Sequence, residues 1–139
     1  MTAETHGEPL ALIIDDDDKL SIMFAEALRQ AGFNTQVIHD GAEALAKIQM
    51  CQPALIMLDL HLPHVSGDKI LGAIRRTESL AQTRVIITTA DATLATALRQ
   101  PSDLVLIKPI SILQLRDLAK QLRAAITATA DQATRPGNG

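Results

Sequence analysis

The fold is decided by the stretch Ala54-Leu55-Ile56-Met57-Leu58-Asp59, in which an unbroken apolar run ends on a carboxylate. A short apolar run that begins after Pro53 is typical of a strand buried on both faces of a sheet. A carboxylate at the tip of such a strand costs free energy unless another group pairs with it. Asp59 therefore predicts a set of polar partners close by.

Three further apolar runs also end on polar side chains. Leu10–Ile14 leads into Asp15-Asp16-Asp17-Asp18, Val85–Ile87 leads into Thr88 and Thr89, and Leu104–Ile107 leads into Lys108 and Pro109. Ligands of an open parallel sheet bind beyond the carboxyl ends of its strands. If these strands are parallel neighbours, acids, a hydroxyl and an ammonium converge at one edge of one sheet.

The segments between these runs carry apolar residues at helical spacing. Asp40 with Glu43, and Ser111 with Gln114, have the spacing of capping boxes, and Gly32 is placed to end the first helix. We predict strands at 10–14, 35–38, 54–58, 84–88 and 104–107, and helices at 18–31, 40–50, 68–77, 92–99 and 112–126. Alternating strands and helices favour an α/β fold with a parallel sheet covered on both faces.

Composition limits the classes of function. The chain has 139 residues, of which 47% are hydrophobic, so a single domain with a real core is expected. Aromatic residues make up 1% and the net charge is −3, which argues against direct nucleic-acid binding. Cys51 is the only cysteine, which excludes an internal disulfide and a thiolate metal site.

The N-terminus lacks the basic start and the apolar stretch of a signal peptide. No apolar run approaches the roughly 18 residues that a membrane span requires. We therefore expect a cytoplasmic protein without a membrane partner.

The converging side chains suit a magnesium site. Carboxylates of Asp15, Asp16 and Asp59 would repel one another, and a divalent cation removes that conflict. Mg²⁺ prefers oxygen ligands and is usually held by one or two carboxylates together with a phosphate. With Thr89 and Lys108 at the rim, the site is suited to phosphoryl transfer onto a carboxylate.

The run of aspartates leaves a second register open, in which Asp16 and Asp17 form the acidic pair. We prefer Asp15 and Asp16 because these two residues directly follow the strand. Asp17 and Asp18 then serve as loop and N-cap residues of the first helix.

Four motifs together resemble the receiver domain of two-component response regulators, including the stand-alone, chemotaxis-regulator-like type. The resemblance covers about residues 10–126. The motifs occur in the family's order and at strand ends: Leu12-Ile13-Ile14-Asp15-Asp16, Leu58-Asp59-Leu60-His61-Leu62-Pro63 with Ser66-Gly67 after it, Thr88-Thr89-Ala90, and Ile107-Lys108-Pro109. The resemblance implies a flavodoxin-like doubly wound sheet of five strands in the order 2-1-3-4-5.

The resemblance also implies the chemistry. Asp59 would accept a phosphoryl group from a phosphohistidine of a histidine kinase or a histidine phosphotransfer protein. Asp16, Asp59 and the backbone carbonyl of His61 would bind Mg²⁺ directly, and Asp15 would act through water. Thr89 would hydrogen-bond the phosphoryl group, Lys108 would pair with Asp59 or its phosphate, and the Lys108–Pro109 bond would be cis. Such a domain is not an enzyme beyond its own phosphorylation and autodephosphorylation at Asp59.

The chain departs from the family pattern on the output side. Val105 stands where the family usually has an aromatic residue, Ile110 stands where Phe is common, and the stretch from Thr89 to Lys108 is about three residues shorter than usual. Output would then depend on the loop after Thr89, on the helix at 92–99, or on a partner that reads the site directly.

Two other functions remain open. The first is a phosphorylation-independent interaction domain with the receiver fold, and the second is a Mg²⁺-dependent phosphohydrolase.

Leu94, Leu98 and Leu113 serve either ordinary packing or a partner patch, which would allow a homodimer through 92–99, 104–107 and 112–126. The expected organisation is a flexible segment at 1–8, a receiver domain at 9–128, and a flexible tail or linker at 129–139. The domain would be either a stand-alone regulator that acts on a downstream protein or the receiver of a longer protein with an output domain.

Overall fold

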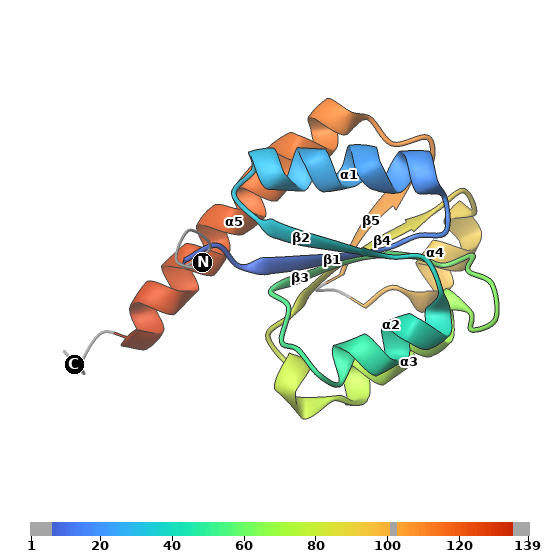
Figure 1. Cartoon of the computed structure of the whole chain (residues 1–139), viewed down its shortest axis with the longest axis horizontal. Coiled ribbons are helices and arrows are strands. Elements are labelled where there is room, and N and C mark those ends of the chain that lie inside the picture. The colour runs from blue at the N-terminus through green and yellow to red at the C-terminus, as the bar shows by residue number, and fades with distance from the viewer. Residues whose placement is uncertain (1–6, 101–102, 135–139) are drawn as a thin grey trace.

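The computed structural model describes residues 7–100 and 103–134. They form a parallel sheet of five strands in the order β2-β1-β3-β4-β5, which confirms the predicted fold class and strand order (Figure 1). The strands are β1 (Leu10–Ile14), β2 (Asn34–Ile38), β3 (Leu55–Asp59), β4 (Arg84–Thr89) and β5 (Leu104–Ile107). The helices are α1 (Asp18–Gln30), α2 (Gly41–Ile48), α3 (Gly67–Arg76), α4 (Ala92–Leu98) and α5 (Ile112–Thr134), with a 3₁₀ turn at Glu78–Leu80.

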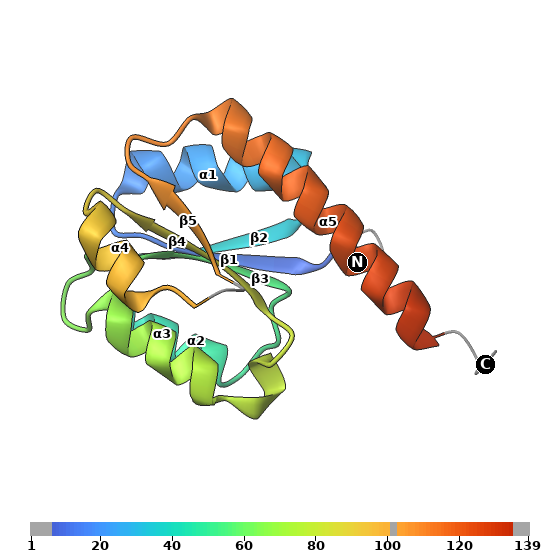
Figure 2. The same cartoon turned by 180° about the vertical axis from the view of Figure 1, so that it is seen from behind.

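The helices cover the sheet in two layers. Helices α1 and α5 lie on one face, and α2 and α3 lie on the other, where α4 packs at the β4–β5 edge (Figures 1 and 2). Successive residues of a strand point to opposite faces, so each strand feeds both layers. Ile13 and Met57 pack toward α1 and α5, whereas Ile14 and Leu58 pack toward α2 and α3.

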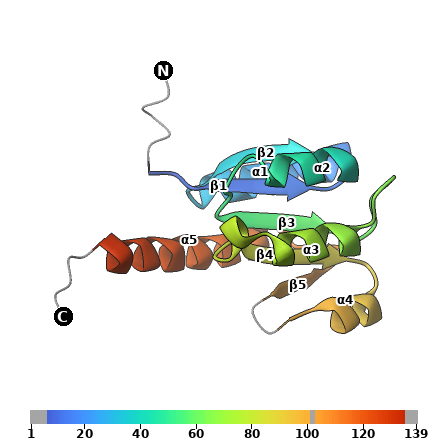
Figure 3. The same ribbon diagram turned by 90° about the horizontal axis from the view of Figure 1, so that it is seen from below.

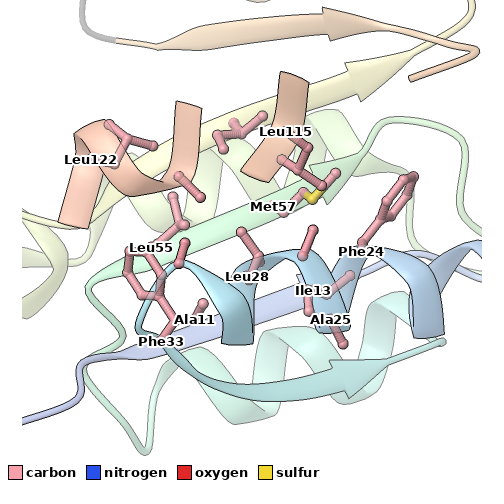
Figure 4. Close-up of a cluster of buried hydrophobic side chains, with 14 residues drawn as sticks. Ala11, Ile13, Phe24, Ala25, Leu28, Phe33, Leu55, Met57, Leu115 and Leu122 are labelled. Carbon is pink, nitrogen blue, oxygen red and sulfur yellow. The ribbon is translucent and has the colours of Figure 1, made fainter. Parts of the chain in front are cut away.

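The core is aliphatic, as the composition predicts. Both phenylalanines, Phe24 and Phe33, belong to the cluster between the sheet and the pair α1 and α5 (Figure 4). Burial is greatest in the middle of the sheet, because β3 is buried along its whole length while β5 at the edge is only partly buried. Asp103, just before β5, is buried and pairs with Arg75 of α3.

Several helices begin at aspartate caps. Asp17, Asp40 and Asp91 each accept a backbone N–H from the first turn of α1, α2 and α4 respectively. Asp40 accepts from Ala42 rather than from Glu43, so the capping box predicted there is not formed in that way. Ser111 does accept from the backbone of Gln114 at 3.2 Å.

The structure corrects several predicted boundaries. β3 and β4 each extend one residue further, because Asp59 still pairs with Thr88, and Thr89 with Ile107, in the sheet. α2 ends at Ile48 rather than near Met50, and α3 begins at Gly67. The extension of β3 places Asp59 within the sheet rather than just after the strand.

The largest correction concerns α5, which continues to Thr134 instead of ending at Ile126. The added stretch is rich in alanine and contains no glycine or proline before Pro136, so nothing in it stops a helix. In Figure 3, α5 runs well past the strands, on the side away from their carboxyl ends. Part of the tail that we expected to be flexible is therefore helical, and 135–139 lie outside the described residues.

Some predictions concern residues near the ends of the described ranges. Residues 1–6 of the expected N-terminal segment lie outside the described residues, as do residues 101 and 102 before the fifth strand. The carbonyl of Gly7 accepts from Arg123 of α5 at 2.8 Å. Within the described part of the chain, no helix combines the length and apolarity that a membrane crossing requires.

Candidate functional site

Three carboxylates gather at the carboxyl ends of β1 and β3. Asp15 and Asp16 follow β1, Asp59 ends β3, and one oxygen from each of the three lies within 4.8 Å of the others. Asp15 and Asp59 are 2% and 4% exposed, whereas Asp16 is exposed. The acidic site thus combines two buried carboxylates with one exposed carboxylate.

Lys108 joins the two buried acids. Its Nζ donates to Asp15 Oδ2 at 3.1 Å and to Asp59 Oδ2 at 3.2 Å. The lysine follows β5 and precedes a cis bond to Pro109, as predicted, and its backbone N–H donates to the carbonyl of Thr89 at 2.8 Å. One ammonium therefore reaches from the edge strand across β4 to the centre of the sheet.

The second oxygen of each buried acid also has a donor. The backbone N–H of Asp17 donates to Asp15 Oδ1 at 2.9 Å, and that of His61 donates to Asp59 Oδ1 at 3.0 Å. Each carboxylate is thus held between a peptide N–H of the loop that follows it and the shared lysine. This arrangement fixes the orientation of both carboxylates before any ligand arrives.

Burial and neighbouring charges have opposite effects on the pKa values of Asp59 and Lys108. Desolvation raises the pKa of Asp59 above its usual value, with a smaller push from Asp15, although the His61 N–H and Lys108 oppose it. Burial by itself would lower the pKa of Lys108, but the charges of Asp15 and Asp59 outweigh burial and raise it. Lys108 is therefore firmly cationic, while Asp59 is a carboxylate with a raised affinity for protons.

Thr89 is fully buried at the end of β4. Its hydroxyl oxygen accepts the backbone N–H of Asp91 at 3.0 Å, and Asp91 in turn caps α4 by accepting from Leu94 at 3.0 Å. The structure thus connects the threonine to the start of α4.

The alternative register of the aspartate run is not the one that the structure favours. Asp17 is exposed and caps α1 by accepting the backbone N–H of Leu20 at 2.9 Å. Asp16, and not Asp17, lies with Asp15 and Asp59. The contact that His61 makes with Asp59 is through its backbone N–H, and the residue as a whole is exposed.

Sequence reasoning missed His39. Its Nδ1 lies 2.9 Å from the backbone oxygen of Asp15, and its Nε2 lies 3.3 Å from Asp18 Oδ1. Its position in the sequence could have identified it. His39 directly follows β2, and β2 neighbours β1 in the predicted strand order, so His39 lies beside the residues that follow β1. His39 thereby braces the loop that carries the acids.

The carboxylate oxygens of Asp15, Asp16 and Asp59 fit a hard divalent cation. All three acidic side chains offer oxygen, and the two buried ones are already oriented by peptide N–H groups. Two buried carboxylates beside one ammonium retain an excess of negative charge, which a cation would offset.

Comparisons of the sequence with known proteins point to one family. The pattern of the response regulator receiver domain matches residues 11–120. The transcriptional regulatory protein TrcR of Mycobacterium tuberculosis is 32% identical over 141 residues, covering 95% of this chain and 53% of TrcR. The DNA-binding response regulator MtrA of Mycolicibacterium smegmatis is 29% identical over 121 residues, covering 87% of this chain and 52% of MtrA. The chain thus spans about half the length of these curated relatives.

Solved structures show the same fold. The receiver domain of a LuxO-type repressor from Vibrio parahaemolyticus has a TM-score of 0.79 and 26% identity, covering 93% of this chain and 99% of its own. The receiver domain of the sensor histidine kinase PA1611 from Pseudomonas aeruginosa, described with magnesium in its active-site cleft, has a TM-score of 0.72 and 20% identity. It covers 84% of this chain and 98% of its own, and at that identity the likeness concerns the fold alone.

Proposed function

We propose, for a chain that belongs to the response regulator receiver domain family of two-component signalling, that Asp59 accepts a phosphoryl group from a phosphohistidine in a Mg²⁺-dependent reaction. The observation that carries the proposal is the grouping of Asp15, Asp16 and Asp59 within 4.8 Å, with Lys108 donating to the two buried acids. The phosphohistidine would belong to a histidine kinase or a histidine phosphotransfer protein.

In the transfer step, an oxygen of the Asp59 carboxylate forms a bond to phosphorus as the nitrogen–phosphorus bond of the phosphohistidine breaks. The imidazole nitrogen leaves with the bonding electron pair, and the ring is neutral because its other nitrogen carries a proton. Hydrolysis ends the signal. Water attacks phosphorus, the bond between phosphorus and the Asp59 oxygen breaks, and inorganic phosphate and the free carboxylate are formed. The domain thus turns over only its own phosphoryl group.

The residues around Asp59 have distinct roles in this step. Asp16, Asp59 and the backbone carbonyl of His61 would hold the metal directly, and Asp15 would hold it through water. When bound, Mg²⁺ supplies positive charge that offsets the phosphoryl oxygens. Lys108 offers a second positive charge beside the acceptor oxygen of Asp59, and Thr89 exchanges its contact with Asp91 for a hydrogen bond to the phosphoryl group.

Mass spectrometry of the intact protein tests the proposal. The protein incubated with Mg²⁺ and acetyl phosphate should gain one phosphoryl group, which chelation of the metal should prevent. Asp59→Asn should abolish the gain, whereas Asp117→Asn on the exposed surface of α5 should label like the wild type. No adduct on the wild type, or an undiminished adduct on Asp59→Asn, would contradict the proposal.

Output is a separate question. A second candidate function, an interaction domain that signals without phosphate, is favoured by Val105 on the partly buried edge strand and by the short helix α4. It would be abandoned if labelling of Asp59 changed the oligomeric state or the binding of a partner. Labelling that stops at one group per chain would exclude a phosphohydrolase acting on outside substrates.

The relatives suggest where the signal goes. MtrA is named as a DNA-binding response regulator, and this chain matches about half of it. We infer that the domain acts in the cytoplasm and passes its signal to an output domain or a downstream protein, either directly or through a homodimer that uses α4, β5 and α5. Sizing chromatography before and after labelling would test the homodimer.

A further inference from the structure

We propose that Asp40 and Gly41, at the start of α2, are positioning residues for the reaction at Asp59. They hold the loop between β3 and α3 so that the His61 peptide meets the carboxylate. The inference rests on the proposed function, and it adds to that function two residues that lie outside the acidic pocket.

The β3–α3 loop, residues 60–66, carries part of the site. Its His61 N–H orients Asp59, and its His61 carbonyl is the proposed metal ligand. At the first residue of the loop, Leu60 N–H donates to the carbonyl of Thr88 in β4, and Leu60 O accepts from Gly67 N–H at the start of α3, both at 3.1 Å. In the middle of the loop, Val65 N–H donates to the carbonyl of Pro63 at 2.8 Å, a contact internal to the loop. The middle therefore depends on neighbouring elements for its position.

The neighbouring element is the start of α2. A Cβ atom on Gly41 would lie 2.4 Å from the backbone oxygen of Val65 and 2.8 Å from its Cβ. The first of these contacts is with backbone, which cannot rotate away as the end of a long side chain can. Only glycine lets the helix approach the loop this closely. The loop and α2 are therefore in backbone contact.

A second contact lies beside the first. His64 Nδ1 is 3.5 Å from Asp40 Oδ1, the same carboxylate oxygen that caps α2 by accepting from Ala42 at 2.9 Å. The backbone φ of His64 is 70°, in the left-handed region that residues other than glycine rarely adopt. Such a conformation persists only where the surroundings hold it. Asp40 is the acidic group that lies against this strained residue.

Together, the two contacts connect α2 to Asp59 through a short path. Gly41 touches Val65 and Asp40 touches His64, whereas the His61 peptide, in the same loop, contacts Asp59. A displacement of the loop by the width of a methyl group would move that peptide. Misplacement of a reacting group by about 1 Å can cost on the order of 100-fold in rate.

A pair of glycine substitutions tests the inference in the full chain. Gly41→Ala inserts a methyl group between α2 and Val65. Gly72→Ala, within α3, adds the same group where its nearest contact is the mobile end of the Arg76 side chain at 3.1 Å. We expect Gly41→Ala to lower both the calorimetric Mg²⁺ affinity and the rate of labelling by acetyl phosphate by about tenfold. Gly72→Ala should leave both unchanged.

Asp40→Ser provides the second variant, which serves even if Gly41→Ala does not fold. Serine retains a cap for α2 and removes the carboxylate from His64. We expect a smaller decrease, about two- to fivefold, in Mg²⁺ affinity and labelling rate, with thermal stability close to the wild type.

The outcomes separate a positioning role from packing. Loss of stability with unchanged Mg²⁺ affinity and labelling rate in the folded protein would overturn the inference, because a residue that only packs changes stability alone. If the wild type binds Mg²⁺ but takes no phosphoryl group, the proposed function fails. The Mg²⁺ affinities then still decide whether α2 positions the loop.

Discussion

The two halves of the sheet's carboxyl edge differ in how firmly they hold their side chains. At β1 and β3, Asp15 and Asp59 are buried, and each is fixed by a peptide N–H and by Lys108. At β4 and β5, the Thr89 hydroxyl accepts the backbone N–H of Asp91, the cap of α4, and the edge strand is partly exposed. The proposed chemistry therefore sits in the rigid centre of the domain, and the proposed output sits at its adaptable edge.

The resemblance in sequence predicts the same division. It implies that Asp15, Asp59, Thr89 and Lys108 belong to motifs of the family, and that Val105 on β5 replaces an aromatic residue. A change in the buried centre affects several oriented groups at once. A change at the edge alters one partly exposed side chain, so the edge can vary without disturbing the acidic pocket.

The largest expected contrast is in stability. Leu58 in β3 and Val105 in β5 pack against the same apolar cluster, but Leu58 is fully buried and Val105 is partly exposed. We expect Leu58→Ala to lower the free energy of unfolding by about 2–5 kcal/mol, and Val105→Ala by about 1 kcal/mol. Urea denaturation followed by circular dichroism measures both, since the chain lacks Trp and Tyr. Equal losses would show that the edge is as rigid as the centre.

The next prediction concerns the shared ammonium. Lys108→Met leaves the oxygens of Asp15 and Asp59 without their common donor in a buried setting. We expect a loss of about 1–3 kcal/mol in metal-free buffer, and a smaller loss in Mg²⁺, which would replace part of the missing charge. Lys120→Met, at an exposed position of α5, is the matched control. An unchanged stability without metal would mean that Lys108 contributes little to the centre.

The raised pKa of Asp59 gives a pH-dependent prediction. Burial raises this pKa in the folded state, so the folded protein binds the proton more tightly than the unfolded chain does. The resulting stabilisation is present below the unfolded pKa of about 3.9 and is lost as the pH rises through the folded pKa. Each unit by which the folded pKa exceeds the unfolded one is worth about 1.4 kcal/mol.

Asp59→Asn removes the loss of stability at rising pH, because the amide does not ionise. Without divalent cations, we expect the variant to be more stable than the wild type at neutral pH, and the advantage to shrink as the pH falls toward the unfolded pKa. Denaturation of both proteins across this pH range, with chelator present, measures the difference. A constant difference at all pH values would refute the role of Asp59 ionisation.

Much of the fold follows from local sequence. Each buried strand is a continuous apolar run, and each run ends on the polar residue that the structure places at the site. The end of α5 was predicted too early, because we placed it at the last apolar residue of the packed face, although alanine continues a helix without packing. Asp59 was placed outside its strand because the pairing with Thr88 depends on a neighbouring strand.

The composition of the acidic pocket was also predictable, since parallel strands bring their ends together. Its supports were not, because they come from segments that are distant in sequence. His39 reaches Asp15 from β2, and Gly41 reaches Val65 from α2. A glycine at the start of a helix, or a histidine just after a strand, can have many roles, and only the three-dimensional contact identifies the one it plays here.

The smallest expected effect comes from introducing an aromatic residue at the edge. Val105→Tyr places a larger side chain on a strand that is partly exposed, where the ring can turn toward solvent instead of entering the packed centre. We expect a change in unfolding free energy below about 1 kcal/mol and a labelling rate by acetyl phosphate within about twofold of the wild type. The new tyrosine also supplies a fluorescent reporter that the natural chain lacks.

Comparison of the labelled and unlabelled Val105→Tyr protein then tests whether the two halves communicate. A change in tyrosine emission on labelling, with an unchanged labelling rate, would show that the centre moves the edge through Thr89 and α4 while the edge leaves the chemistry alone. A labelling rate that falls far below the wild-type value would instead show that the edge strand controls the acidic pocket. Lys108 provides a direct route for such control, because it follows β5 and reaches both buried acids.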